Sequence, residues 1–131
     1  MQVLQPSGWA RPKGYSNGIL AEGRLVFIAG MIGADAAGRI ESDSFVSQAR
    51  RALENILAIL AEAGGKPGHI CRMSWYVTDR QEYLANLASL GAVYREVMGS
   101  HFPAMTLVEV SALVADRAKL EIEATAALPQ S

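Results

Sequence analysis

The order of apolar and polar residues predicts strands towards both ends of the chain and two helices between them. Near the N-terminus, the apolar runs Ile19–Ala21 and Arg24–Met31 are separated by Glu22-Gly23. This spacing is typical of a β-hairpin. The next segment, GADAAGRI, has glycine and aspartate at the positions of a turn. We therefore expect a hairpin followed by a loop.

From Asp43 the apolar residues recur at steps of three and four, which is the period of an amphipathic helix. The residues of this stripe are Phe45, Ala49, Ala52, Leu53, Ile56, Leu57 and Leu60. Ser42 or Asp43 can accept hydrogen bonds from the free N–H groups of the first turn. Gly64-Gly65 should end the helix, because glycine tolerates the left-handed conformation found there, and Pro67 prevents its continuation.

The segment ICRMSWYVTD alternates and predicts a strand with Cys71, Met73, Trp75 and Val77 on one face. Asp79 and Glu82 then resemble a capping box, which marks the start of a second helix. The apolar stripe of that helix is Tyr83, Leu84, Leu87, Leu90, Tyr94 and Val97, and Gly99 is expected to end it.

Two more strands follow, joined by a turn at VADRA. Leu120, Ile122, Ala124 and Ala126 share one face of the last strand, opposite Lys119, Glu121, Glu123 and Thr125. The predicted order is ββαβαββ, a single α+β domain over residues 1–131. Two helices can cover only one face of the sheet, and we expect Met105, Leu107 and Glu109 on the other. A symmetric oligomer would cover that mixed face and form sites between subunits.

Composition narrows the function. The chain has 131 residues, a formal net charge of -1 and no run of Lys or Arg, which argues against nucleic-acid binding. The single cysteine, Cys71, lies in an apolar stretch and is interpreted as a small buried hydrophobe. His69 and His101 belong to no metal-ligand motif, and we expect His101 at the surface. The N-terminus lacks a signal-peptide pattern and no apolar run has transmembrane length, so we expect a cytoplasmic protein without membrane contact.

Five segments of the chain together resemble a known family. In order they are KGYSNGI, LVFIAGMIG, QARRALENILAILAEAGG, YVTD and FPAMTLVEV…LEIEATA. Their order and spacing, from about Pro12 to Ala127, are similar to the RidA (YjgF) family, whose older name is endoribonuclease L-PSP. The resemblance implies a chorismate-mutase-like fold and a homotrimer that binds small molecules in clefts between subunits. It also implies hydrolysis of reactive enamines and imines to ketoacids and ammonia, without metal or cofactor.

The resemblance also implies roles for individual residues. Tyr15 matches the tyrosine of the family's GPYSQ segment, and Gly30 matches the glycine of its SGQ segment. Glu121 matches the glutamate that positions or activates the attacking water in deaminating members. We therefore expect Glu121 and Tyr15 to be catalytic residues. Other interpretations remain: Glu121 can pair with Lys119 or an arginine, and Tyr15 can be a ring packed beneath a turn.

Several ligand-binding positions depart from the family pattern. Ala29 and Met31 replace a serine and a glutamine around Gly30. Met105 stands where the family's PARS segment has the arginine that holds the substrate carboxylate. Leu107 replaces a cysteine and Gly91 a pocket asparagine. Each change lowers polarity or volume, which favours a larger and more apolar ligand in the same cleft.

Met105 bears directly on the expected reaction. An arginine holds a carboxylate through charge-assisted hydrogen bonds worth about 1.5–3 kcal/mol each, and methionine has no donor. Ordinary 2-iminoacid deamination is therefore not expected unless Arg24, Arg72 or Arg117 supplies the charge, with Arg72 the first candidate.

We expect a hydrolase with altered, more apolar specificity. The alternatives are a non-catalytic small-molecule-binding or regulatory trimer, and a decayed cleft in which Met105 only packs. RNA cleavage rests on the older family name alone.

Overall fold

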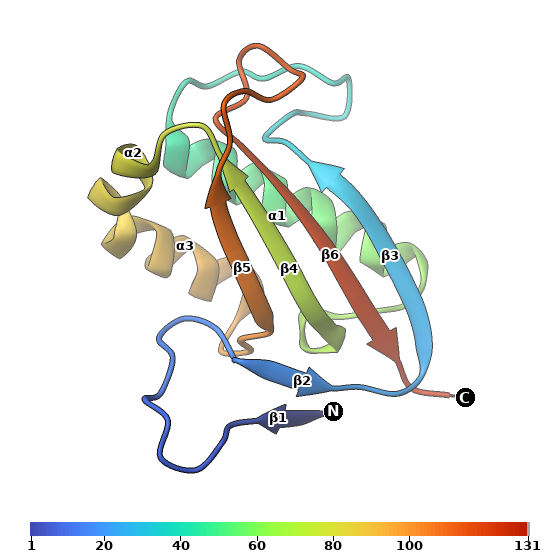
Figure 1. The fold of residues 1–131 in the computed structure, drawn as a ribbon. Helices are drawn as coiled ribbons and strands as arrows, with labels where there is room; N and C mark the ends of the chain where they lie inside the picture. Colours follow the sequence, from blue (N-terminus) through green and yellow to red (C-terminus); the bar gives the residue numbers. More distant parts are fainter. Residues whose placement is uncertain (131) are drawn as a thin grey trace.

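The structure is a computed structural model that describes residues 1–130. Four strands form a mixed sheet in the order β3 (Arg24–Met31), β6 (Leu120–Leu128), β4 (Ile70–Val77) and β5 (Ala104–Glu109). Only β4 and β5 run parallel. The helices α1 (Phe45–Glu62) and α3 (Leu87–Met98) lie together on one side of this sheet, behind it in Figure 1. The predicted α+β fold with a mixed sheet is confirmed.

The predicted hairpin is wrong. β2 (Gly18–Leu20) pairs with β1 (Gln2–Leu4), a strand that the pattern did not predict, and β3 pairs with β6. The chain changes direction at Gly23, where φ is +134° and an added Cβ would lie 2.0 Å from the carbonyl oxygen of Leu128. Glu22-Gly23 therefore serves as a bend that carries the chain from the small sheet to the main one.

α1 forms the centre of the core. Its predicted stripe is buried at Phe45, Ala49, Ala52, Leu53, Ile56 and Leu60. The helix begins one or two residues later than expected, because the hydroxyl of Ser44, not of Ser42 or Asp43, accepts the N–H of Ser47 at 3.2 Å. Gly64 has φ +79° after the helix, as predicted. A short 3₁₀ helix, η1 (Pro67–His69), then leads into β4.

β4 follows the predicted alternation except at its start. Met73, Trp75 and Val77 are buried towards the helices. Cys71 lies in a bulge, since Ile70 pairs with Ala126 while Arg72 pairs with Thr125. The half-buried Cys71 thiol donates to the Thr125 carbonyl oxygen at 3.3 Å, and burial raises its pKa. Because the thiolate is disfavoured, Cys71 is a poor nucleophile.

The second predicted helix is two helices, α2 (Arg80–Ala85) and α3. Asp79 caps α2 as expected, accepting the N–H groups of Gln81 and Glu82. The break comes at Asn86, whose backbone leaves the helical region with φ −116° and ψ 17°. Its side-chain amide donates to the Glu82 carbonyl oxygen at 2.7 Å. This local bond competes with helix continuation, as is typical of asparagine.

The predicted orientation of β5 is wrong. Met105 pairs with Met73 and Leu107 with Trp75 in parallel register, so these side chains point to the helix-covered side. Both pack against the main core. Thr106 and Val108 lie on the uncovered side instead. Alternation defines two faces of a strand, but only the pairing with β4 shows which face meets the helices.

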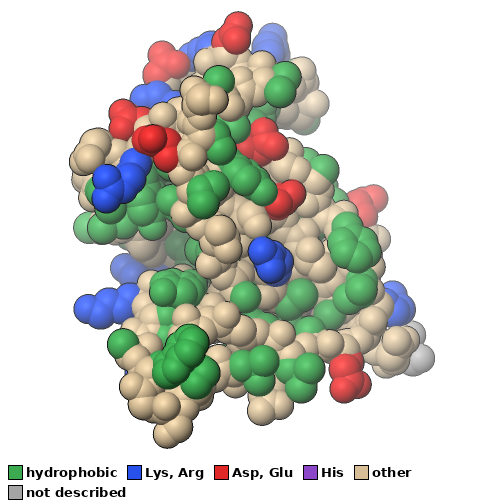
Figure 2. All heavy atoms as spheres, viewed as in Figure 1, with side chains coloured by type: hydrophobic (Ala, Val, Ile, Leu, Met, Phe, Trp, Pro, Cys, Tyr) green, Lys and Arg blue, Asp and Glu red, His purple; other side chains and the backbone are tan. Residues whose placement is uncertain are grey.

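We call the side of the main sheet away from the helices the open face. The predicted alternation of β6 is confirmed, with Leu120 and Ile122 buried and Glu121 and Glu123 on this open face. Large apolar residues of β3 and β5 are also exposed on the open face: Leu25, Phe27 and Val108. Figure 2 shows hydrophobic side chains interspersed with charged ones across this face.

Candidate functional site

A cavity of about 680 Å³ lies on the helix side of the β4–β5 edge, which we call the helix-side cavity. Aromatic and apolar side chains form most of its wall: Tyr15, Trp75, Tyr83, Leu87, Leu90, Tyr94, Phe102, Met105 and Leu107. Gly91 and Gly14 also line it, and its two charged residues are Lys13 and Arg95. This volume is within the range of small-molecule sites.

Tyr15 reaches this cavity because the next residue anchors the N-terminal segment. The buried Ser16 donates its N–H to the Pro103 carbonyl oxygen at 3.0 Å and its hydroxyl to the Phe102 carbonyl oxygen at 2.6 Å. Ser16 also bridges Ala104 at the start of β5. Tyr15 therefore lies at the same cavity as Met105, and it keeps 40% of its surface exposed.

The loop before β5 is held by aromatic and histidine contacts. Tyr94 stacks on Phe102 with ring centroids 5.7 Å apart, and its hydroxyl donates to the His101 carbonyl oxygen at 3.0 Å. Burial raises the pKa of Tyr94. The Nε2–H of His101 donates to the Ile70 carbonyl oxygen at 2.6 Å. His101 is thus half-buried, not at the surface as predicted, and it supports the cavity without lining it.

Arg95 is a cavity residue that the sequence analysis did not identify. A Cβ added at Gly91 would lie 3.4 Å from its Nη1 atom, so the guanidinium folds back over the glycine one helical turn earlier. Long helical side chains lean towards the N-terminus in this way. The i, i+4 spacing of Gly91 and Arg95 could have indicated that the arginine lies over the glycine. It points to a ligand site only once α3 is known to face a cavity.

The three arginines considered from the sequence lie elsewhere. Arg117 donates to the Asp43 carboxylate at 2.8 Å and to the Ile40 carbonyl oxygen. Arg24 donates to the Pro129 carbonyl oxygen at 3.4 Å. Arg72 lies on the open face, on the opposite side of the sheet from Met105. Within the described part of the chain, none of the three lines the helix-side cavity.

Gly30 and Glu121 are in direct contact across β3 and β6. The pairing of these strands shifts between Ile28 and Met31, which leaves Gly30 in an irregularity. A Cβ added at Gly30 would lie 2.1 Å from Oε2 of Glu121. Only glycine therefore allows the Glu121 carboxylate to lie against β3 in this position.

The two glutamates of the open face differ in their partners. Glu123 accepts the hydroxyl of Tyr76 at 2.7 Å, and this bond raises the pKa of Tyr76. Glu121 has no hydrogen-bond or ion-pair partner among residues 1–130, Lys119 included; Lys119 binds Glu82 instead. Glu121 is thus the carboxylate that is free to bind a water or a ligand.

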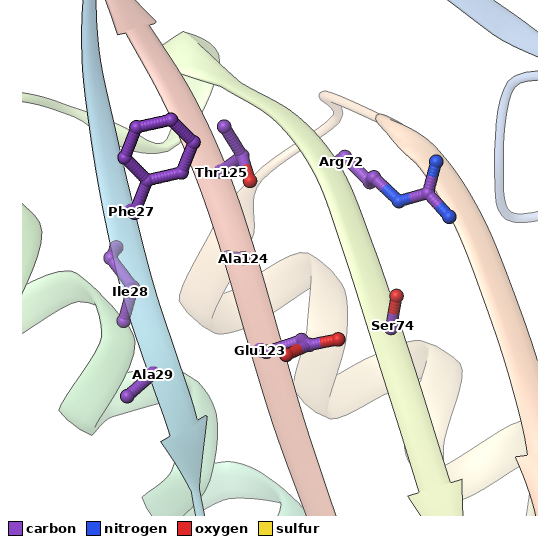
Figure 3. Close-up of a pocket in the computed structure, with 8 residues that line it drawn as sticks. All are labelled: Phe27, Ile28, Ala29, Arg72, Ser74, Glu123, Ala124 and Thr125. Atoms are coloured by element: carbon purple, nitrogen blue, oxygen red, sulfur yellow. The ribbon is translucent and has the colours of Figure 1, made fainter.

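Ala29 lines a second, smaller hollow of about 420 Å³ on the open face. Figure 3 shows its residues: Phe27, Ile28 and Ala29 from β3, Glu123, Ala124 and Thr125 from β6, and Arg72 and Ser74 from β4. Arg72 and Glu123 give this hollow charges of both signs. It is therefore more polar than the helix-side cavity.

The structure divides the predicted site residues into two groups. Tyr15, Gly91, Met105 and Leu107 line the helix-side cavity. Ala29, Gly30 and Glu121 lie on the open face, and Met31 packs against the core. A single chain does not bring Met105 and Glu121 together, because the sheet lies between their side chains.

The described residues contain neither a metal-ligand cluster nor a membrane-spanning helix. Among residues 1–130 no three His, Cys, Asp or Glu side chains come close enough to hold a metal ion. In the same residues, each helix is too short or too polar to cross a membrane.

Comparison with known proteins identifies the family. The family model for endoribonuclease L-PSP matches residues 9–128. A RutC family protein of Pyrococcus horikoshii is 39% identical over 127 residues, with 95% of this chain and 96% of that protein covered. A 2-iminobutanoate/2-iminopropanoate deaminase of Salmonella typhimurium is 36% identical over 107 residues, with 79% and 80% covered.

Solved structures agree with this assignment. A Rid-family protein of unknown function from Yersinia pestis matches with a TM-score of 0.85 and 28% identity, covering 97% of this chain and 98% of that one. RidA from an Antarctic Psychrobacter matches with a TM-score of 0.69 and 29% identity, covering 98% and 100%. The chain therefore belongs to the RidA (YjgF, endoribonuclease L-PSP) family.

Proposed function

We propose that this protein is a cofactor-independent deaminase that hydrolyses an imine or enamine carrying an apolar group. Family membership and the deaminase among its relatives support the reaction class. The observation that carries the proposal is the Glu121 carboxylate, which rests against Gly30 and has no partner among the described residues. A carboxylate placed in this way can act as a general base towards a bound water.

The reaction needs only water and one proton-transfer group. Glu121 accepts a proton as the water oxygen bonds to the imine carbon, and the C=N double bond becomes a C–N single bond. That proton passes to nitrogen and gives a carbinolamine. The hydroxyl proton is then transferred through Glu121 to nitrogen as the C–N bond breaks, the C=O bond forms and ammonia leaves. An imine plus water thus gives a ketone or ketoacid plus ammonia, with no change of oxidation state and no further reactant.

The separation of the two residue groups supports a site shared between copies of the chain. The open face carries the large exposed residues Leu25, Phe27 and Val108, an apolar surface typical of an association site. We propose a homotrimer in which the Glu121 surface of one subunit meets the helix-side cavity of the next. Head-to-tail contacts close into a ring when the rotation between successive copies allows it, and we propose a closed ring of three.

The cavity wall supports the apolar specificity. Met105 and Leu107 present a thioether and an aliphatic side chain beside Tyr15, and Met adapts to varied ligand shapes. We expect the imine derived from leucine to react faster than 2-iminopropanoate, because its isobutyl group buries more apolar surface.

The test is the disappearance of imines generated in place by an amino-acid oxidase from leucine and from alanine. The Glu121→Gln variant should lower kcat by about 10²–10⁴, whereas the matched Glu123→Gln variant should keep it. A protein that accelerates the loss of neither imine would contradict the proposal, as would an unchanged rate in Glu121→Gln.

A non-catalytic binding trimer is the second candidate. One observation favours it: in the described chain, no carboxylate lines the helix-side cavity. Binding of an apolar ligand without any loss of imine would support this alternative.

A further inference from the structure

The helix-side cavity is positively charged as well as apolar. Its only charged lining residues, within the described chain, are Lys13 and Arg95. Both are exposed at its rim, while aromatic and aliphatic side chains form the walls. This arrangement places positive charge at the entrance of an apolar space.

Arg95 is held over the cavity without an internal partner. Its guanidinium lies over Gly91, which also lines the cavity. Among residues 1–130 this group forms no ion pair and no hydrogen bond. Nearby acidic groups are already engaged: Glu96 pairs with Arg50, and Glu82 binds Lys119 at 2.8 Å. Arg95 is thus free to bind an anion from solution.

A second polar group in the cavity wall is also without a partner. Trp75 is only 5% exposed and lines the cavity, and its buried Nε1–H finds no acceptor within the described residues. A buried N–H without an acceptor costs about 1–3 kcal/mol. This atom has less than 1 Å² of accessible surface, so Trp75 offers the cavity its ring surface and not this N–H group.

We propose that Arg95 is the anion-binding residue of the helix-side cavity, and that the cavity takes a carboxylate attached to an apolar body of about the size of a leucine or phenylalanine side chain. The carboxylate binds the Arg95 guanidinium, with Lys13 adding charge, and the body packs on Trp75, Met105 and Leu107. This inference rests on the proposed function for the location of the site and names the substrate class.

The chemistry favours a carboxylate over other ligands. A guanidinium binds a carboxylate through two parallel N–H···O bonds, and a cationic ligand would meet two like charges at the rim. A small acid such as pyruvate lacks the apolar body that would pack on Trp75, Met105 and Leu107. An extended ligand with several negative charges would also fit poorly, because the aromatic rings of the walls offer those charges no partners.

The test uses three probes of graded chemistry in calorimetric titrations. These are 4-methyl-2-oxopentanoate, pyruvate, and the uncharged 4-methyl-2-pentanone, which keeps the branched skeleton without the carboxylate. The wild-type protein should bind 4-methyl-2-oxopentanoate most tightly. Arg95→Gln should weaken that binding by about tenfold or more and leave the ketone unaffected.

Two further variants separate Arg95 from general effects of charge and folding. Arg80→Gln removes an exposed arginine of α2 that does not line the cavity, and its affinity should match wild type. Gly91→Asn keeps the arginine at position 95 but should displace its guanidinium from the cavity. Binding of 4-methyl-2-oxopentanoate should therefore become weaker. Equal binding of acid and ketone, equal loss in Arg80→Gln, or wild-type affinity in Arg95→Gln would each overturn the proposal.

These experiments can refute the anion site and the deaminase proposal independently. If 4-methyl-2-oxopentanoate binds through Arg95 but no imine is hydrolysed, the deaminase proposal fails and the anion site stands. If imines are hydrolysed equally well by Arg95→Gln, the anion site fails and the deaminase stands.

Discussion

The helix-side cavity and the open face of the sheet differ in the chemical groups that they present. The cavity is walled by aromatic and aliphatic side chains, has arginine and lysine at its rim, and has no carboxylate among its described lining residues. The open face has large exposed apolar residues, a smaller hollow, and Glu121, which has no partner among residues 1–130. The groups suited to recognition and to proton transfer are therefore on opposite sides of one sheet.

Because of this difference, a single chain cannot form the proposed site. A sheet about one residue thick separates Met105 from Glu121, and no side-chain rotation moves either across it. A second copy docked on the open face would bring its own cavity to Glu121. Each of the following predictions removes one feature of one region and leaves the other intact.

The largest effect is expected from Phe27→Glu. Phe27 is 75% exposed on the open face, and a carboxylate there beside Glu123 should prevent a second copy from docking. Light scattering should show a smaller species, and deaminase activity should be lost. Leu84→Glu, on α2 and outside the cavity lining, is the matched control and should leave the assembly intact. Unchanged assembly in Phe27→Glu would contradict the role of this face.

The next largest effect is expected from Gly30→Ala. The new Cβ would lie 2.1 Å from Oε2 and 2.9 Å from Cγ of Glu121, so the carboxylate must move away from β3. Misplacement of a catalytic group by about 1 Å can cost about 10²-fold in rate. We expect kcat to fall by up to that factor while the cavity still binds 4-methyl-2-oxopentanoate. Equal losses of turnover and binding would show that the two regions are not separable.

A smaller effect is expected from Gly91→Ala in the cavity wall. Glycine inside a helix costs about 1 kcal/mol relative to alanine, and the added Cβ would be in ordinary contact with Arg95 at 3.4 Å. The free energy of unfolding in urea should therefore rise by about 1 kcal/mol. Gly68→Ala, in η1 outside both regions, serves as a comparison. A loss of stability in Gly91→Ala would mean that the space beside Arg95 is smaller than described.

The smallest effect is the pH dependence of the stability that Tyr94, in the cavity wall, contributes. Burial raises the pKa of Tyr94 in the fold, so its neutral form contributes stability that is fully present below the unfolded value of about 10. That contribution is lost as pH rises from there towards the folded pKa. The stability gap between wild type and Tyr94→Phe should narrow by just under 1 kcal/mol between about pH 8 and 10.5. A constant gap in urea unfolding would show that Tyr94 titrates normally.

Local periodicity predicted those elements whose burial depends on their own sequence. The stripe of α1 and the alternation of β6 were both predicted, because each packs a single regular face against the core. The break at Asn86 was missed, since apolar residues continue on both sides of it. Its cause is one local hydrogen bond to the Glu82 carbonyl oxygen.

Long-range pairing decided the features that could not be predicted. Ile19 pairs with Val3 and not with β3, and the orientation of Met105 follows from its pairing with Met73. The resemblance identified Gly30 and Glu121, but only the strand pairing shows that they touch. Arg95 was missed because its role depends on a cavity formed by segments far apart in the sequence.

In the proposed trimer, the cavity and the carboxylate of each site come from different copies of the chain. The direct test is to unfold and refold an equal mixture of Glu121→Gln and Arg95→Gln and to assay the leucine-derived imine. In randomly assembled head-to-tail trimers, about one quarter of the sites combine both unaltered residues. We predict recovery of about one quarter of wild-type activity by that same count. Activity that stays at the mean of the two separate variants would contradict the account.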